Sequence, residues 1–96
     1  MLTLAAHSVV VSVVPPPAIT AVQGKGNPYK LFITGTNFHQ GCVVKIDGNT
    51  VWTVWKSTTL VQARSVKYYV RKGKPVSVTV TNMDDGLVSA AFAFTR

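Results

Sequence analysis

The sequence predicts an all-β protein, an immunoglobulin-like antiparallel β-sandwich of about seven strands. From Ala18 onward apolar and polar residues alternate, and turn-forming residues recur every eight to twelve positions. This is the pattern of half-buried strands joined by short turns. No segment shows the periodicity of a helix. The 96 residues, 47% of them hydrophobic, suffice for one domain with a single core.

The first two predicted strands cover residues 18–22 and 29–34. Residues 23–28 separate them and contain two glycines and a proline, residue types that interrupt strands. In the second strand Leu31 and Ile33 share one face, because side chains alternate along a strand.

The second strand continues into the sequence Gly35-Thr36-Asn37-Phe38. We expect Gly35 to let the chain bend sharply, because glycine adopts conformations that are costly for other residues. The side chains of Thr36 and Asn37 can satisfy the backbone groups that the bend frees. Phe38 is then expected to enter the end of the sandwich as a buried plug.

The other predicted strands cover residues 43–47, 50–55, 58–65, 76–81 and 87–94. Between the first two of these, Gly48-Asn49 predicts a tight hairpin, because both residue types tolerate a positive φ. In the last strand Phe92 and Phe94 share a face.

Residues 76–81 have the clearest strand pattern in the chain, because Val occupies every second position. The valines are expected to face the core, and Ser77, Thr79 and Thr81 are expected to face water.

The three prolines of residues 15–17 predict a stiff linker. Residues 1–14 lack the basic start of a signal peptide, and their Val-rich second half predicts a strand. That strand belongs either to a preceding domain, which we favour, or to the edge of this one. Residues 18–96 are then the β-sandwich domain of a longer, multidomain protein.

Five sequence elements occur in order: Pro17-x-Ile19, ITGTNF (33–38), IDG (46–48), VSVTVTNMDDG (76–86) and FAF (92–94). Together they resemble the IPT/TIG domain over residues 16–95. This immunoglobulin-like module occurs in cell-surface receptors such as plexins, in secreted bacterial proteins and in the dimerisation regions of some transcription factors. The chain departs from the family at Val22-Gln23-Gly24, where Ser-Pro usually follows the first strand.

The sequence gives little support to catalysis. It contains no Glu, and its three acidic residues, Asp47, Asp84 and Asp85, fall in two predicted turns, where Asp side chains bond nearby backbone groups. His7 and His39 are isolated and lack the spacing of metal ligands. We therefore expect no enzyme, no cofactor and no metal site.

The formal net charge of +7, from ten Lys and Arg against three Asp, favours acidic partners. No apolar run approaches the roughly 20 residues of a membrane-spanning helix, so we expect no membrane insertion. The single cysteine, Cys42, cannot form an internal disulfide and is expected to be a small buried residue.

Two features indicate binding. Residues 66–74 surround two tyrosines with basic groups, which suits phosphates, bases or acidic sugars; the alternative is a solvated loop whose lysines protect a sheet edge. Trp52 and Trp55 are three residues apart on a strand and point to opposite faces, so at most one joins the core. An exposed Trp suits a sugar, a protein partner or a neighbouring domain. The candidate ligand-binding residues are Trp52, Trp55, Lys67, Tyr68, Tyr69, Arg71, Lys72 and Lys74, with Arg64 just upstream.

The resemblance to bacterial IPT/TIG domains, which often stand in tandem or beside glycan-handling domains, implies a non-catalytic spacer and interaction module of an extracellular or cell-surface protein. Its expected partners are neighbouring domains and a polysaccharide or another protein, with carbohydrate as the leading ligand class. The positive charge favours an alternative, a nuclear or intracellular transcription-factor module that dimerises and contacts the DNA backbone. However, the sequence has no Arg-rich arm and no base-reading constellation. A structural module of a large assembly is the third possibility.

Overall fold

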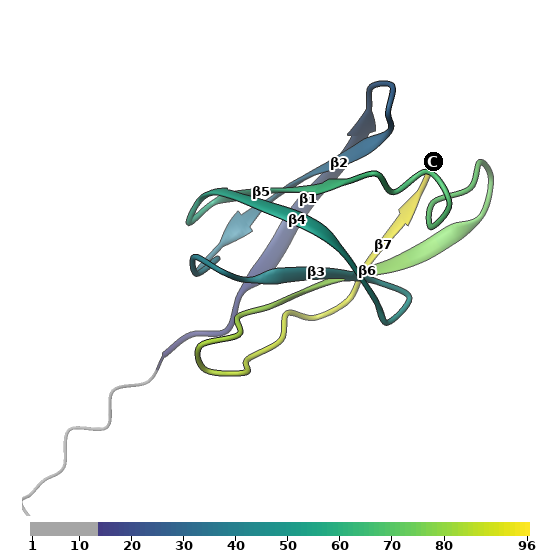
Figure 1. Ribbon diagram of the computed structural model, residues 1–96. Helices are drawn as coiled ribbons and strands as arrows, with labels where there is room; N and C mark the ends of the chain where they lie inside the picture. The colour runs from purple at the N-terminus through teal and green to yellow at the C-terminus, as the bar shows by residue number, and fades with distance from the viewer. Residues whose placement is uncertain (1–13) are drawn as a thin grey trace, which may run out of the picture.

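The computed structural model describes residues 14–96, which form seven strands (Figure 1). Every strand pair is antiparallel, so the predicted all-β class is confirmed. The predicted tail or strand of residues 1–14 lies almost wholly outside the described residues. The strands are β1 (Ala18–Lys25), β2 (Lys30–Thr36), β3 (Val43–Ile46), β4 (Asn49–Ser57), β5 (Leu60–Arg64), β6 (Pro75–Thr81) and β7 (Phe92–Thr95).

The strands follow the order β1-β2-β5-β4-β3-β6-β7 in one continuous hydrogen-bonded sheet. Strand β4 joins two layers, because residues 49–51 pair with β3 whereas residues 52–57 pair with β5. One layer is therefore β1-β2-β5-β4 and the other is β3-β6-β7. This is the strand arrangement of an immunoglobulin constant-type sandwich, as predicted.

The core lies between the two layers and is made chiefly of valines and other aliphatic residues. Leu31 and Ile33, which were predicted to share one face, are both fully buried, and the valines of β6 face inward, as predicted. Ser77 is exposed and Thr79 half-buried. The prediction that Thr81 faces water was wrong: Thr81 is buried where Val88 forms a β-bridge with it.

The chain does leave β2 sharply, but Asn37 and not Gly35 makes the bend. Asn37 has a φ of 61°, in the left-handed region that Asn tolerates better than most residues. Gly35 keeps a strand conformation and is needed for space. A Cβ on Gly35 would collide with the carbonyl oxygen of Ala18 and would lie 2.7 Å from Cζ of Phe38.

Phe38 is the buried plug that the sequence predicts, with no exposed surface. Its N–H donates to the carbonyl oxygen of Thr58 at 3.0 Å, and its own carbonyl oxygen accepts from Nε1 of Trp55 at 2.9 Å. The plug is therefore held by its backbone as well as by the packing of its ring.

The hairpin between β3 and β4 turns one residue earlier than predicted. Its central residues are Asp47 and Gly48, with φ angles of 50° and 83°, and Ile46 pairs with Asn49 across the turn. A two-residue turn with both φ angles positive matches the right-handed twist of the strands that it joins. The predicted Gly48-Asn49 turn was wrong because Asn49 already belongs to β4.

The first strand is longer than predicted and continues to Lys25. Gly24 does not end it, because Gly24 pairs with Leu31 and provides room for the Tyr29 ring. Within residues 14–96 there is no helix long and apolar enough to cross a membrane.

Replacing Phe38 by Ala should lower the free energy of unfolding by about 3–5 kcal/mol, the usual loss for a buried Phe. Urea denaturation measures it. The control is Met83→Ala, because Met83 is 62% exposed and its loss should change stability by less than ~0.5 kcal/mol. Equal midpoints for the two variants would refute the role of Phe38 as a plug.

Candidate functional site

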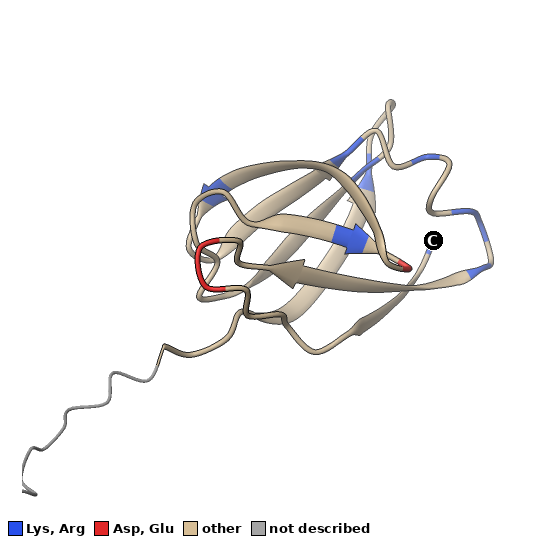
Figure 2. Ribbon diagram, turned by 60° about the horizontal axis from the view of Figure 1, so that its bottom comes forward, with Lys and Arg blue, Asp and Glu red and all other residues tan. Residues whose placement is uncertain are grey.

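Most of the Lys and Arg residues gather at one end of the sandwich, which is also where the described chain ends (Figure 2). Contacts between segments place them together: the N–H of Val66 donates to Tyr29 O, and the N–H of Gly73 donates to Arg96 O. We call this the basic end. It comprises Lys25, Lys30, Arg64, Lys67, Arg71, Lys72, Lys74 and Arg96.

The basic loop between β5 and β6 is held in place by buried residues. Val66 and Val70 have no exposed surface, and the N–H groups of Tyr69 and Val70 both donate to Val66 O. Tyr68 and Tyr69 point away from this anchor and are 79% and 41% exposed. The loop therefore presents two aromatic rings from a fixed backbone.

The structure brings four of the predicted residues together. Tyr68, Tyr69, Arg71 and Lys74 line one hollow. Lys67 and Lys72 are exposed in the same loop but do not line it. The rest of its wall consists of Asp47, Pro75 and Val76.

The Asp47 carboxylate in this wall also has a structural partner. Its Oδ1 accepts from the N–H of Ser77 at 2.9 Å, and the Asp47 N–H donates to the Ser77 carbonyl oxygen at the same distance. The residue therefore extends the pairing of β3 with β6 by one step. The side chain of Asp47 does bond a backbone group, but the prediction of a nearby partner was wrong, because Ser77 lies 30 residues away.

The two tryptophans lie on opposite faces of β4, as predicted. Trp55 packs against the core and donates to Phe38 O, so it is a structural residue. Trp52 is 63% exposed and pairs across the strands with Arg64. It is therefore available to a ligand next to the basic loop.

Arg96 closes a second hollow at the basic end, between β1 and β7. Its guanidinium lies 3.9 Å from the centroid of the Tyr29 ring, and its Nη1 donates to Val70 O at 3.3 Å. The hollow is lined by Gln23, Gly24, Lys25, Tyr29, Phe94, Thr95 and Arg96. Because Arg96 is engaged in these contacts, we interpret it as a residue that fixes the loop.

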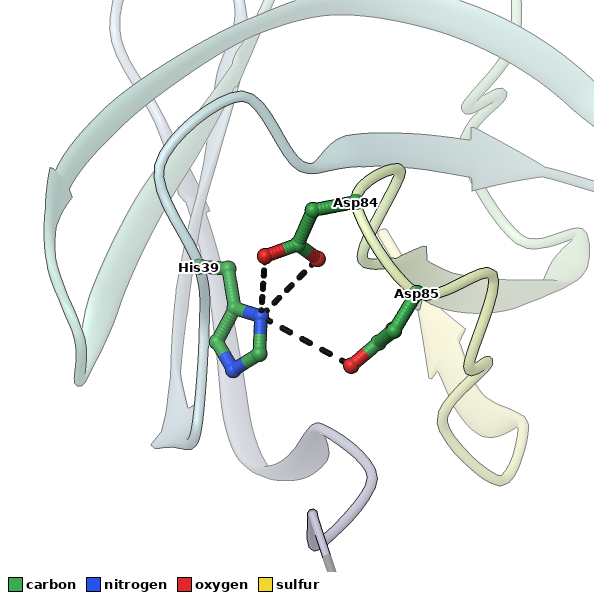
Figure 3. A group of neighbouring side chains, drawn as sticks. All are labelled: His39, Asp84 and Asp85. Atoms are coloured by element: carbon green, nitrogen blue, oxygen red, sulfur yellow. Dashed lines mark hydrogen bonds and ion pairs between the residues drawn. The ribbon is translucent and has the colours of Figure 1, made fainter.

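The opposite end carries an ion pair that sequence reasoning missed (Figure 3). Nδ1 of His39 lies 2.9 Å from both carboxylate oxygens of Asp84 and 3.8 Å from Oδ2 of Asp85. The prediction that His39 is isolated was therefore wrong; His7 lies outside the described residues. Hydrogen bonding to Asp84 raises the pKa of His39 above its usual 6.5, and hydrogen bonding to His39 lowers the pKa of Asp84 below its usual 3.8.

Asn82 also connects the two loops that carry this ion pair. It is fully buried, its Oδ1 accepts from the His39 N–H at 3.0 Å, and its Nδ2 donates to Asn37 O at 2.9 Å. These partners are 43 and 45 residues away, and no local pattern indicates such a contact. The side chain of Asn82 thus links the bend after β2 to the turn after β6 through two hydrogen bonds.

The imidazole of His39 and the two carboxylates could ligate a cation, because their ligand atoms lie within 4.8 Å of one another. Exposed carboxylates often lie this close in ion pairs, and here the imidazole nitrogen already contacts Asp84. We therefore interpret the cluster as an ion pair. Cys42 is buried, as predicted, and burial raises the pKa of its thiol, which disfavours the reactive thiolate.

This fold and this distribution of side chains define an immunoglobulin-like module that exposes aromatic and basic groups at its basic end. The profile of the IPT/TIG domain family matches residues 8–95, so the chain belongs to that family, as the sequence elements predicted. IPT/TIG domains are generally non-catalytic modules. No curated protein matches the chain.

Exchanging His39 for Gln should make stability less dependent on pH. Because the folded pKa of His39 is raised, the ion pair stabilises fully below about pH 6.5, and this stabilisation is lost as pH rises through the folded pKa. Because the folded pKa of Asp84 is lowered, its contribution is present above about pH 4 and is lost in acid.

The measurement is the melting temperature of the parent and of His39→Gln between about pH 4 and 8.5. The parent should exceed the variant most near about pH 5–6, and the difference should shrink toward pH 8. Since His7 is present in both proteins, its effect on the pH dependence cancels in the difference between their melting temperatures. A difference that stays constant over this range would contradict the ion pair.

Replacing Asn82 by Ala should lower the free energy of unfolding by roughly 2 kcal/mol or more, since each buried polar group left without a partner costs about 1–3 kcal/mol. Asn49→Ala is the matched control, because Asn49 is exposed. Urea denaturation of both variants tests this. Equal midpoints would show that the hydrogen bonds of the Asn82 side chain do not stabilise the fold.

Proposed function

We propose that this IPT/TIG domain is a non-catalytic spacer and interaction module of a larger secreted or cell-surface protein, with carbohydrate as its ligand class. The supporting observation is the group of exposed aromatic side chains at the basic end. Trp52, Tyr68 and Tyr69 present their rings to solvent there, on a strand and a loop that are both held by the core.

Aromatic rings of this kind suit sugars for a physical reason. A pyranose has an apolar C–H face that stacks on an aromatic ring, and a side chain with few rotatable bonds loses little entropy when it is covered. Surrounding Lys and Arg side chains add hydrogen-bond donors for sugar oxygens. The adjoining hollow, lined by both tyrosines, Arg71 and Lys74, gives a ligand a second surface to contact.

The test is affinity electrophoresis of the full chain through gels that contain neutral or acidic polysaccharides, supported by Trp fluorescence. We expect retardation by at least one polysaccharide, and weaker retardation of Trp52→Ala and of the double variant Tyr68→Ala/Tyr69→Ala. The control is Met83→Ala, an exposed apolar residue of the β6–β7 turn, away from the basic end. If no polysaccharide retards the parent protein, the carbohydrate proposal is wrong and only the proposed role as a spacer remains.

A second candidate function, contact with a nucleic-acid backbone, is favoured by the clustering of Lys and Arg at the basic end. Binding through phosphates releases counterions, so the affinity for duplex DNA should fall steeply between about 50 and 200 mM salt. Changing Arg71, Lys72 and Lys74 to Gln should flatten that dependence. No binding of duplex DNA even at low salt would eliminate this candidate.

A further inference from the structure

We propose that the outer face of the β1-β2-β5-β4 layer, at the basic end, binds an acidic sugar chain. In this site Arg64 receives the carboxylate or sulfate of one sugar, and Trp52 stacks on a sugar ring. The inference rests on the proposed carbohydrate function and adds to it the class of sugar and the residues that select it.

The pairing of the strands places the site on the outer face. Trp52 lies opposite Arg64, and Phe32 lies opposite Gln62. Their neighbours along the strands, including Leu31, Val61 and Ala63, are buried in the core. Because side chains alternate along a strand, Trp52, Arg64, Gln62 and Phe32 share the outward face.

Arg64 is held in position by two contacts. Its Nε and Nη2 donate to Oε1 of Gln62 at 3.1 and 3.0 Å, and its Cζ lies 5.9 Å from the centroid of the Trp52 ring. Gln62 is itself only 9% exposed, so the group that holds the guanidinium is fixed. A ligand then meets an ordered guanidinium and loses less entropy on binding.

The held guanidinium keeps free donors for an anion. Among residues 14–96, Nη1 of Arg64 has no hydrogen-bond partner, and Nη2 has only the one to Gln62. A guanidinium offers its N–H groups in a planar fork that matches the oxygens of an oxyanion. The exposed indole of Trp52 lies beside it, so one sugar can present its acidic group to Arg64 while its ring contacts Trp52.

A second pair of the same kind lies further along the face. Nζ of Lys25 is 4.7 Å from the centroid of the Phe32 ring. Phe32 is two strands from Trp52 in the order β2-β5-β4, about 10 Å across the sheet. A chain of several sugars can reach both pairs, whereas a single sugar cannot, so affinity should rise with the length of the saccharide.

The charges on this face select an acidic ligand. Lys25, Lys30 and Arg64 lie on it or at its margin, on adjacent strands. All three Asp side chains lie elsewhere, Asp47 in the β3–β4 turn and Asp84 and Asp85 between β6 and β7. Trp52 is 63% exposed and lines neither of the two hollows described above, whereas the anchor of a protein partner usually sits in a desolvated pocket.

The experiment measures the affinity of the full chain for polygalacturonate, dextran sulfate, neutral dextran and single-stranded DNA at about 150 mM salt, where long-range attraction is screened. The variants are Arg64→Lys, Arg64→Gln and Trp52→Ala. The matched control is Lys45→Gln, which removes one positive charge from β3 in the other layer. A melting curve of each variant checks that it is folded.

We expect the parent to bind an acidic polysaccharide and to ignore neutral dextran. Arg64→Lys keeps the charge but loses the fork, and it should weaken binding about tenfold. Trp52→Ala should weaken binding to a similar extent, while Lys45→Gln should change the affinity less than about threefold. Preference for polygalacturonate identifies a carboxylate ligand, and preference for dextran sulfate identifies a sulfate ligand; both support the site.

Each other outcome overturns the inference in a distinguishable way. If the parent binds acidic polysaccharide and the Arg64 and Trp52 variants bind it as well as Lys45→Gln does, the ligand does not bind at Arg64 and Trp52, but the proposed carbohydrate function stands. If the parent binds neutral dextran equally well, Arg64 does not select the ligand. Tighter binding to single-stranded DNA than to either acidic polysaccharide would mean that the ligand of this face is a nucleic acid and not a sugar. If no polysaccharide binds, both proposals fail.

Discussion

The architecture depends on a close approach between the end of β2 and the start of β1. Gly35 lies against the carbonyl oxygen of Ala18, and the Phe38 ring covers the same glycine. Because Gly35 has no side chain, the Phe38 ring can pack against its backbone and fill the end of the sandwich. The hydrogen bonds of Phe38 to Thr58 and Trp55 then connect this end to the neighbouring segments of the first layer.

The two ends of the sandwich have different roles as a result. At the end beside Phe38, Asn82 and the His39–Asp84 ion pair close the loops onto one another, so their polar groups are used internally. At the basic end the valines of the β5–β6 loop are buried and its tyrosines are exposed. Polar and aromatic groups at the basic end therefore remain available, and both proposed binding functions lie there.

Alternation along strands predicted most of the fold, because a period of two fixes which residues face the core. It placed the β6 valines inside, separated Trp52 from Trp55, and gave the correct class. It could not position turns to one residue, since Asp47, Gly48 and Asn49 all tolerate a positive φ. Nor could it find Asp84, the partner of His39, which is 45 residues away. The contact of Arg64 with Gln62 and Trp52 was also missed, because side-chain contacts depend on the register of the strands.

The direction in which the chain crosses the sandwich has a mechanical consequence. Residues 14–17 lead into β1 at one end, and the chain leaves β7 at the other (Figure 1). A pulling force between these points acts along the axes of β1 and β7, each of which is hydrogen-bonded along one side to β2 or β6. The bonds of each ladder are then loaded together in shear instead of being broken one after another, a geometry that resists extension.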